Sequence, residues 1–429
     1  MYDLVIIGAG WAGFNAALKA KHLGLKVCLI EKAQVGGTCL NLGCIPTKAL
    51  IQSAKVYALT KKSSAFGIEV SNPKIDFNKI QERKDKIIQQ LRSGMQFMLK
   101  NIDFLNAEAK ILSAEEIEVS GKTIKTKFIL IATGSRPIEL SAVKFDAKKI
   151  LSSSDALELK EIPESLLIIG GGVIGCEFAS LFSILGSQVA IAEKMPQLLP
   201  GEDREVAQKI ETLFKKKGIK VNTNTDANTL NAAGYNLILV CVGRAPKTEG
   251  LGLEKIGIKL DKGKVAVDEY LKTNIDNIYA AGDCTGKTML AHFAAYQGIT
   301  AAENIAHPEK PKKADNTNIP NCVFTDPEIA SVGLSEDIAR GEGMDISIHK
   351  FDFLGSGMAR ITDETDGFIK IISDKKTDQI LGASIIGPRA TELIATLTLA
   401  VSNQLKISQL KGIIFAHPTF SEAIGEALR

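Results

Sequence analysis

The 429-residue chain has no excess of one charge, because 52 Lys and Arg residues are matched by 49 Asp and Glu residues, a net charge of +3. It lacks the broad basic field that nucleic-acid binding usually shows, and we expect no nucleic-acid partner. A hydrophobic fraction of 45% excludes disordered and fibrous proteins, and the length leaves room for about three domains.

A secretory signal is also missing from the start, MYDLVIIGAG, which carries Asp3 where such a signal would carry Lys or Arg. The cysteines number seven, an odd total. We therefore expect a reducing compartment, the cytoplasm. A close cysteine pair is then interpreted as catalytic or metal-binding before structural.

Two apolar stretches, residues 4–20 and 166–186, could be mistaken for membrane spans. The second contains one charge, Glu177, and is long enough to cross a bilayer. Glycines interrupt both stretches after a short aliphatic run, as in a buried strand followed by a tight turn and a helix. We therefore expect no membrane span.

These two stretches belong to an internal repeat, residues 6–32 and 168–194, which align without a gap. Each copy predicts a strand, a glycine turn, an amphipathic helix, a second strand and a terminal acid. The matched positions are Gly8 with Gly170, Gly10 with Gly172, Gly13 with Gly175, and Glu31 with Glu193.

This pattern is typical of dinucleotide binding. The first glycine makes the turn, the second lets the backbone approach a pyrophosphate, and the third lets the helix pack on the strand. The terminal acid can accept hydrogen bonds from a ribose diol. A lone GxGxxG is weak evidence, but two copies in register favour two bound dinucleotides, and a flavin reduced by a nicotinamide is the economical interpretation.

The acid of the second copy favours NAD over NADP, because Glu193 would repel a 2′-phosphate. Lys194 follows it, but Lys32 occupies the same place in the first copy, so a lysine here does not indicate phosphate binding.

Cys39 and Cys44 lie in a glycine-rich segment directly after the first repeat. No second cysteine pair or nearby histidine completes a zinc site, and we expect no metal. Buried structural thiols remain an alternative for each residue singly. The segment leads into a helix, whose dipole would lower a thiol pKa, and this favours a redox-active disulfide. The other five thiols are interpreted as structural.

Several strings, in this order and spacing, resemble the flavin-dependent pyridine nucleotide-disulfide oxidoreductases, and most closely the members that oxidise dihydrolipoamide. The resemblance covers nearly the whole chain. Besides the cysteine segment, the strings are ATGSRP (132–137), GGGVIGCE (170–177), PQLLPGED (196–203), VGRAPKT (242–248), NIYAAGD (277–283), MLAHFAAYQG (289–298), VFTDPEIASVGLSE (323–336) and HPTFSE (417–422).

The resemblance implies an α/β fold with two Rossmann-like dinucleotide-binding domains and a C-terminal α+β dimerisation domain. We expect the FAD-binding domain at residues 1–145 and 270–314. The NAD-binding domain, inserted into it, is expected at 146–269, and the interface domain at 315–429. The implied assembly is a homodimer whose active-site base comes from the partner subunit.

The resemblance also implies an activity, the oxidation of protein-bound dihydrolipoamide to lipoamide with reduction of NAD⁺. Cys44 would lie beside the flavin and Cys39 would meet the substrate. His417 would be the base, oriented by Glu422, and a cis bond is implied before Pro418.

Cofactor contacts are expected by the same resemblance, including an ion pair of Lys48 with Glu177 near the flavin N5. Trp11, the only tryptophan, is interpreted as a packing residue. The residues expected to bind FAD are Gly8, Gly10, Gly13, Glu31, Gly37, Thr38, Lys48, Ala132, Thr133, Gly134, Asp283, Met289, Leu290, Ala291 and His292. Those expected to bind NAD are Gly170, Gly172, Gly175, Glu177, Glu193 and Gly243.

The chain departs from the family between residues 218 and 242, which leave little room for the usual antiparallel excursion of the NAD domain. We expect a more open pocket and weaker NAD binding.

Other functions remain as alternatives. Glutathione-type reductases prefer basic residues where Glu193 and Lys194 stand, and mercuric reductases add a C-terminal cysteine pair, whereas this chain ends GEALR. A non-catalytic flavoprotein scaffold would not need Cys39, Cys44, His417 and Glu422 together. The expected partner is a lipoylated carrier protein of a 2-oxoacid dehydrogenase complex or of the glycine cleavage system, because no lipoyl module is fused at the N-terminus.

Overall fold

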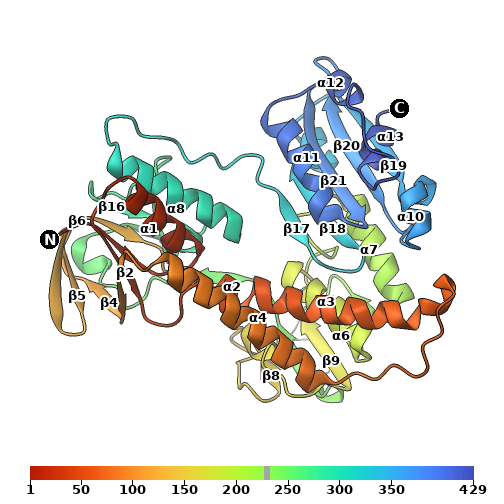
Figure 1. The fold of residues 1–429 in the computed structure, drawn as a ribbon, viewed down its shortest axis with the longest axis horizontal. Helices are drawn as coiled ribbons and strands as arrows, with labels where there is room; N and C mark the ends of the chain where they lie inside the picture. The colour runs from red at the N-terminus through yellow and green to blue at the C-terminus, as the bar shows by residue number, and fades with distance from the viewer. Residues whose placement is uncertain (227–231) are drawn as a thin grey trace.

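The computed structural model describes residues 1–226 and 232–429. Three sheets organise the chain, and each has its own hydrophobic core (Figure 1). The first sheet lies at the left of the view, the second below the centre and the third at the upper right.

The first sheet has seven strands in the order β3-β2-β1-β6-β5-β4, with β16 beside β6. The pairs around β1 are parallel, while β4, β5 and β6 form an antiparallel meander. The strands are β1 (Tyr2–Ile7), β2 (Val27–Glu31), β3 (Asp103–Asn106), β4 (Ala109–Ile111), β5 (Glu116–Val119), β6 (Lys122–Ile131) and β16 (Ile278–Ala280).

Two helices, α1 (Trp11–His22) and α8 (Ala291–Ala306), cover one face of this sheet and are rich in buried alanine. They approach closely because small residues face each other: a Cβ at Gly298 would lie 2.1 Å from the carbonyl oxygen of Ala12. The connection after β2 forms three helices, α2 (Gly37–Leu42), α3 (Cys44–Lys61) and α4 (Phe77–Met98), with the 3₁₀ turn η1 (Ser63–Phe66) between the last two.

The second sheet is parallel, with the order β11-β10-β9-β12-β8, and contains the second repeat. Residues 166–186 form a strand, a glycine turn and a helix, as predicted, so they are not one continuous span. The elements are β8 (Ile150–Leu151), α5 (Ser153–Ala156), β9 (Ser165–Ile169), α6 (Val173–Leu185), β10 (Gln188–Ala192), α7 (Arg204–Lys216), β11 (Lys220–Asn222), η3 (Ala232–Gly234) and β12 (Leu237–Val240).

The connection from β11 to β12 is short. Part of the segment whose shortness we noted, residues 227–231, lies outside the described residues. In the described part of the connection η3 is the one regular element. Two residues of this connection, Ala232 and Tyr235, pack on the face of the second sheet that Val143 and Phe145 also cover.

The third sheet is antiparallel, with the order β17-β18-β21-β20-β19, and α11 packs against it. Its elements are β17 (Asn321–Val323), β18 (Glu328–Gly333), α9 (Glu336–Gly341), β19 (Ile346–Asp352), η6 (Phe353–Gly355), α10 (Gly357–Ile361), β20 (Phe368–Asp374), β21 (Ile380–Gly387), α11 (Ala390–Ser402), α12 (Ile407–Lys411) and α13 (Glu422–Ala427).

The stretch between the second sheet and β16 packs with the first sheet. Leu251, Leu253 and Val265 share a buried cluster with Val5 and Ile7 of β1. This stretch holds β13 (Arg244–Pro246), which pairs with β7 (Ser135–Pro137), as well as η4 (Glu254–Ile256), β14 (Leu260–Asp261) and β15 (Lys264–Val265). We propose that the inserted unit ends near β13, earlier than the expected residue 269.

One helix, α3, joins the three units. Leu50, Ile51 and Ala54 share a buried cluster with α6 of the second unit and with Phe368 and Ile386 of the third. An ion pair also links this helix to the third unit, because Lys55 Nζ lies 2.8 Å from the Glu328 carboxylate of β18. The position of α3 is therefore set by contacts with more than one core.

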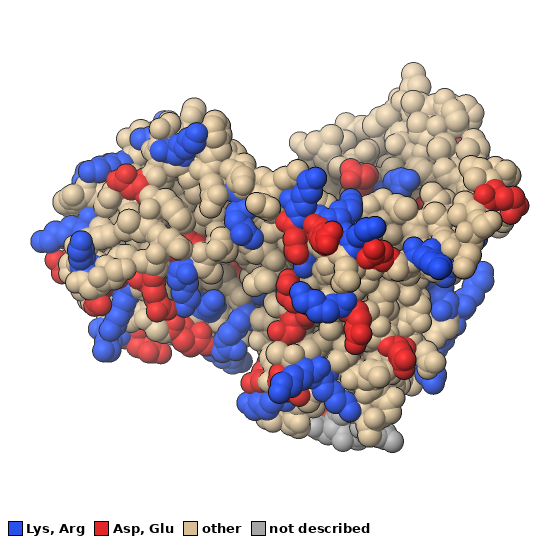
Figure 2. Space-filling view, turned by 60° about the horizontal axis from the view of Figure 1, so that its bottom comes forward, with Lys and Arg blue, Asp and Glu red and all other residues tan. Residues whose placement is uncertain are grey.

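Lysine, arginine and acidic side chains are interspersed over the face drawn in Figure 2. No helix within residues 1–226 and 232–429 is long and apolar enough to cross a membrane.

Candidate active site

The two glycine turns have matching geometry. Gly8 and Gly170 have φ angles of +105° and +104°, which favour glycine. A Cβ at Gly13 would lie 1.8 Å from the carbonyl oxygen of Gly8, so the helix packs directly on the turn, and Gly175 stands equally close to Gly170, at 2.0 Å. A Cβ at Gly172 would meet no atom within 4 Å, which leaves the N-terminus of α6 open to a phosphate.

The terminal acids of the repeats also match. Glu31 Oε2 accepts a hydrogen bond of 2.8 Å from the backbone N–H of Ala9, and Glu193 Oε2 accepts one of 2.6 Å from that of Gly171. These bonds hold each carboxylate beside its turn. Each oxygen keeps acceptor capacity for a ribose hydroxyl.

Cys39 in α2 and Cys44, the first residue of α3, are free thiols that lie against each other. The hydrogen bond from Cys39 lowers the pKa of Cys44 to about 7, with the Lys48 ammonium acting in the same direction. The same bond and burial raise the pKa of Cys39. The reduced pair therefore holds its negative charge on Cys44 near neutral pH.

Lys48 and Glu177 form the expected ion pair, with Lys48 Nζ 2.8 Å from Glu177 Oε2. Glu177 is buried in α6, and its Oε1 also accepts a hydrogen bond of 3.0 Å from the backbone N–H of Phe324. The Lys48 ammonium lies over the Phe324 ring, 4.6 Å from its centroid. The pair thus joins α3, α6 and the residue that follows β17.

Asp283, the last residue of the NIYAAGD string, begins the 3₁₀ turn η5 (Asp283–Thr285). Its Oδ2 accepts a hydrogen bond of 2.5 Å from the Ser135 hydroxyl. Arg244 donates through Nε to that hydroxyl oxygen, at 2.8 Å, and through Nη2 to the Ser135 carbonyl. Because the Ser135 hydroxyl oxygen accepts from Arg244, its own proton points to Asp283.

His417 and Glu422 are paired in the third unit. His417 Nδ1 lies 2.8 Å from Glu422 Oε1, while the backbone N–H of Thr419 donates to Oε2 at 2.8 Å. The Thr419 bond and then the His417 bond lower the pKa of Glu422. The peptide bond before Pro418 is cis, as the resemblance implied. The His417 ring is exposed, and its Nε2 is left for another group.

The His417–Glu422 pair lies apart from the Cys39 and Cys44 thiols of the same chain. Glu422 begins α13, which lies at the upper right of Figure 1, while α2 lies near the centre. A site that contains both must therefore draw them from two chains.

Family models match most of the chain. The model described as pyridine nucleotide-disulphide oxidoreductase matches residues 2–298, and the dimerisation-domain model of the same family matches residues 319–428. The chain belongs to the pyridine nucleotide-disulphide oxidoreductase family. It carries the dimerisation domain of that family, and the expected α/β fold with two dinucleotide-binding units is confirmed.

Relatives extend over the full length. Dihydrolipoyl dehydrogenase of Chlamydia muridarum is 40% identical over 448 residues, covering 99% of this chain and 96% of the relative. The enzyme of Geobacillus stearothermophilus is 41% identical over 449 residues, covering 99% and 95%. Among solved structures, the HOCl-induced flavoprotein disulfide reductase RclA of Escherichia coli has a TM-score of 0.89 at 31% identity, covering 100% of this chain and 99% of RclA.

The residues around the first glycine turn fit the FAD that this family uses. Thr133 Oγ1 and Gln297 Nε2 are buried and lack a hydrogen-bond partner within the described chain. Gln297 is held beside η5, because its Oε1 accepts from the backbone N–H of Gly282 at 2.8 Å. Buried polar atoms are rarely left unpaired, so these two groups suit a ligand with polar atoms.

The other residues predicted to contact FAD or NAD lie at or next to the ends of helices and strands. Gly37 and Thr38 begin α2, and residues 132–134 follow β6. Met289 and Leu290 precede α8, which Ala291 and His292 begin, and Gly243 lies between β12 and β13. Burial lowers the pKa of His292.

Sequence reasoning missed the contacts of Phe324, Arg244, Ser135 and Gln297. All four lie in strings that carried the family resemblance, but these strings gave no sign of which side chains would meet.

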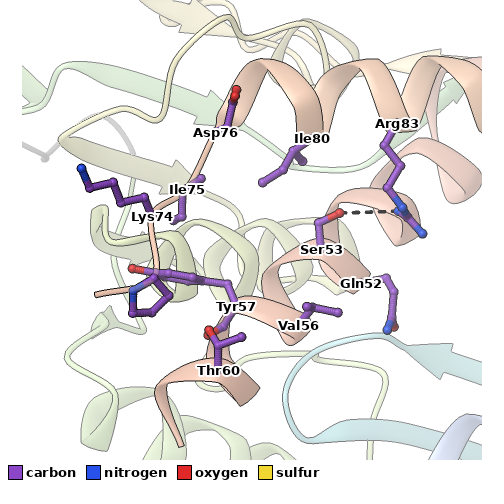
Figure 3. A pocket seen from close by; sticks show the side chains of 11 residues that line it. Gln52, Ser53, Val56, Tyr57, Thr60, Lys74, Ile75, Asp76, Ile80 and Arg83 are labelled. Atoms are coloured by element: carbon purple, nitrogen blue, oxygen red, sulfur yellow. Dashed lines mark hydrogen bonds between the residues drawn. The ribbon is translucent and has the colours of Figure 1, made fainter. Parts of the chain in front are cut away.

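A cavity of about 440 Å³ opens on the second half of α3 and on residues 73–83 (Figure 3). Ser53 and Arg83 face each other there, with Arg83 Nη1 3.5 Å from Ser53 Oγ. None of the residues predicted for catalysis or for cofactor binding lines it.

Proposed function

We propose that two copies of this chain form a dihydrolipoyl dehydrogenase, which oxidises protein-bound dihydrolipoamide to lipoamide and reduces NAD⁺. The observation that carries the proposal is the acidic Cys44 thiol, held between Cys39 and Lys48, in a chain about 40% identical over its full length to dihydrolipoyl dehydrogenases. FAD, held at the first glycine turn, would supply the two-electron redox chemistry that links the thiols to NAD⁺.

The chemistry of the thiols follows from their pKa values. With the pair oxidised, His417 of the partner subunit takes a proton from one substrate thiol, and the thiolate attacks the Cys39 sulfur. The bond between Cys39 and Cys44 breaks, and Cys44 leaves as a thiolate, which suits its lowered pKa. The second substrate thiol, deprotonated in turn, attacks the substrate sulfur bound to Cys39 and closes the lipoamide disulfide, while the bond to Cys39 breaks and Cys39 leaves as a thiolate that is then protonated.

Orientation of the base is the proposed role of Glu422. Its carboxylate accepts from Nδ1–H of His417 and keeps the neutral ring in the tautomer whose Nε2 can take a proton. Glu422 thus has the orienting role of the third member of a triad.

NAD is the proposed acceptor because Glu193, held beside the second turn by its bond to Gly171, is the acid proposed to bind the ribose, and a carboxylate there disfavours a 2′-phosphate. We further propose Asp283 as a residue that holds FAD, with Ser135 and Arg244 positioning it.

The proposed partner is the lipoylated carrier protein of a 2-oxoacid dehydrogenase complex or of the glycine cleavage system, and the proposed location is the cytoplasm. A flavoprotein disulfide reductase with another substrate is the second candidate, supported by the structural similarity to RclA.

The test is anaerobic turnover of the purified dimer with dihydrolipoamide and NAD⁺, beside glutathione disulfide with NADPH. Formation of NADH from dihydrolipoamide, together with a long-wavelength thiolate-to-flavin absorbance, is expected. Reduction of glutathione disulfide by NADPH without dihydrolipoamide oxidation would replace the proposal with the second candidate. A yellow protein inactive in both assays would point to a scaffold.

A further inference from the structure

Trp11 lies where the first dinucleotide turn meets the segment that carries the cysteines. It is the first residue of α1, and its carbonyl accepts a hydrogen bond of 2.8 Å from Asn15 Nδ2. The turn and α2 touch through their backbones, because a Cβ at Gly37 would lie 2.7 Å from the Cα of Gly10. This contact brings residue 11 beside Cys39, the third residue of α2.

The indole N–H of Trp11 is a buried donor without a well-formed hydrogen bond to any residue that the structure describes. Leaving such a group unpaired is costly, and buried donors without partners are few in native proteins. The Cys39 sulfur is within reach of this donor: the hydrogen bond to Cys44 and burial raise the pKa of Cys39, whereas the contact with the Trp11 side chain lowers it.

We propose that Trp11 is a further catalytic residue, whose indole N–H donates a hydrogen bond to the Cys39 sulfur when that sulfur becomes a thiolate. The inference rests on the proposed function, because only thiol–disulfide exchange places a charge on Cys39. The neutral thiol is a weak acceptor, so the donor is incompletely used in the resting pair. Its bond strengthens as charge develops.

The step concerned is the release of product. The second substrate thiolate attacks the substrate sulfur of the mixed disulfide, a new S–S bond forms in the product, and the bond from that sulfur to Cys39 breaks. Cys39 takes the electron pair and leaves as a thiolate, which is then protonated. No oxidant beyond the disulfide already present is needed. The Lys48 charge lowers the pKa of both thiols, whereas the Trp11 side chain acts on Cys39 as a hydrogen-bond donor.

Trp11→Phe removes the N–H and keeps a ring, while Trp11→His returns a ring donor. We expect Trp11→Phe to slow alkylation of Cys39 about tenfold at fixed pH in the reduced holoenzyme, because its thiolate is less stabilised, with kcat for dihydrolipoamide falling about tenfold and FAD content unchanged. NADH oxidation by ferricyanide, which bypasses the thiols, stays within twofold. Trp11→His restores part of the loss. Tyr57→Phe, an aromatic substitution on α3 away from the pair, is the matched control and changes neither quantity.

An unchanged alkylation profile in Trp11→Phe would overturn the proposal. Loss of FAD from that variant with normal Cys39 alkylation would overturn it as well, and would assign the N–H to the cofactor. If Trp11→Phe does not fold, the wild-type dimer supplies the answer, because its single tryptophan gives one indole N–H resonance per chain. That resonance is expected to move when Cys39 is alkylated, and a resonance that does not move counts against the proposal. These readouts need no lipoamide turnover, so failure of the proposed substrate would be seen separately.

Discussion

The Cys39 thiol donates its hydrogen bond to Cys44, so that two cysteines five positions apart ionise in different pH ranges. The bond and the nearby Lys48 lower the pKa of Cys44 to about 7, and the thiolate forms first on the residue that begins α3. The order matters for the proposed reaction, in which Cys44 leaves as a thiolate when Cys39 is attacked.

Removal of that donor should move the titration of Cys44. In Cys39→Ala, we expect the pKa of Cys44 to rise from about 7 toward the ordinary thiol value near 9, because its largest stabilising contact is lost. The thiolate absorbance of the holoenzyme, followed from pH 5 to pH 10, measures the shift. Cys322→Ser, which alters a thiol outside the pair, is the control and should leave the pKa of Cys44 unchanged. An unchanged pKa of Cys44 in Cys39→Ala would show that the hydrogen bond from Cys39 does not lower it.

Loss of Lys48 should destabilise the fold as well as slow the reaction. Lys48→Met leaves the buried Glu177 carboxylate with one backbone donor, Phe324 N–H, and we expect the free energy of unfolding to fall by about 2–4 kcal/mol. The double variant Lys48→Met/Glu177→Gln removes the orphaned charge and should regain much of this stability without regaining activity. Denaturant unfolding of the wild type, Lys48→Met, Glu177→Gln and the double variant gives the coupling energy. A coupling near zero would contradict a role for the pair in stability.

Mixed dimers should reveal the origin of the base. Cys44→Ser and His417→Gln are each expected to abolish or severely reduce turnover as pure dimers. After denaturation and joint refolding in equal amounts, half of the dimers are mixed, and one of their two sites combines intact thiols with an intact base. About a quarter of wild-type activity is therefore expected from random pairing. Activity no higher than that of the pure variants would place the base and the thiols on one chain.

Glu193 should decide the choice of nicotinamide. We expect Glu193→Gln to raise KM for NAD⁺ about tenfold and to narrow the preference over NADP⁺, since an amide does not repel a 2′-phosphate. Steady-state kinetics with both cofactors measures the change, and Lys194→Ala is the control, expected within twofold of wild type. An equal loss with NAD⁺ and NADP⁺ in Glu193→Gln would assign Glu193 to the turn alone, through its bond to Gly171.

Local patterns predicted the parts of the fold that local physics controls. The glycine spacing predicted both turns, because a side chain at the first or third glycine of each turn would clash with the backbone. The burial of the strand and helix on either side of each turn followed from the same pattern. The pairing of Lys48 with Glu177 came from the family resemblance, since 129 positions separate them. Contacts such as those of Trp11 with Cys39, or of Arg244 with Ser135, depend on how whole units pack, and no periodicity in the sequence encodes them.

The helix α3 fixes the position of the Cys44 thiol. Cys44 stands at its first residue, and the helix is fixed through Lys48 to α6 and through Lys55 to β18. Within the second sheet, β11 is the edge strand opposite β8, and the contact of this unit with α3 is made by α6. Changes at the β11 edge therefore do not act directly on α3, so the position of the Cys44 thiol and the properties of that edge can vary independently in this chain.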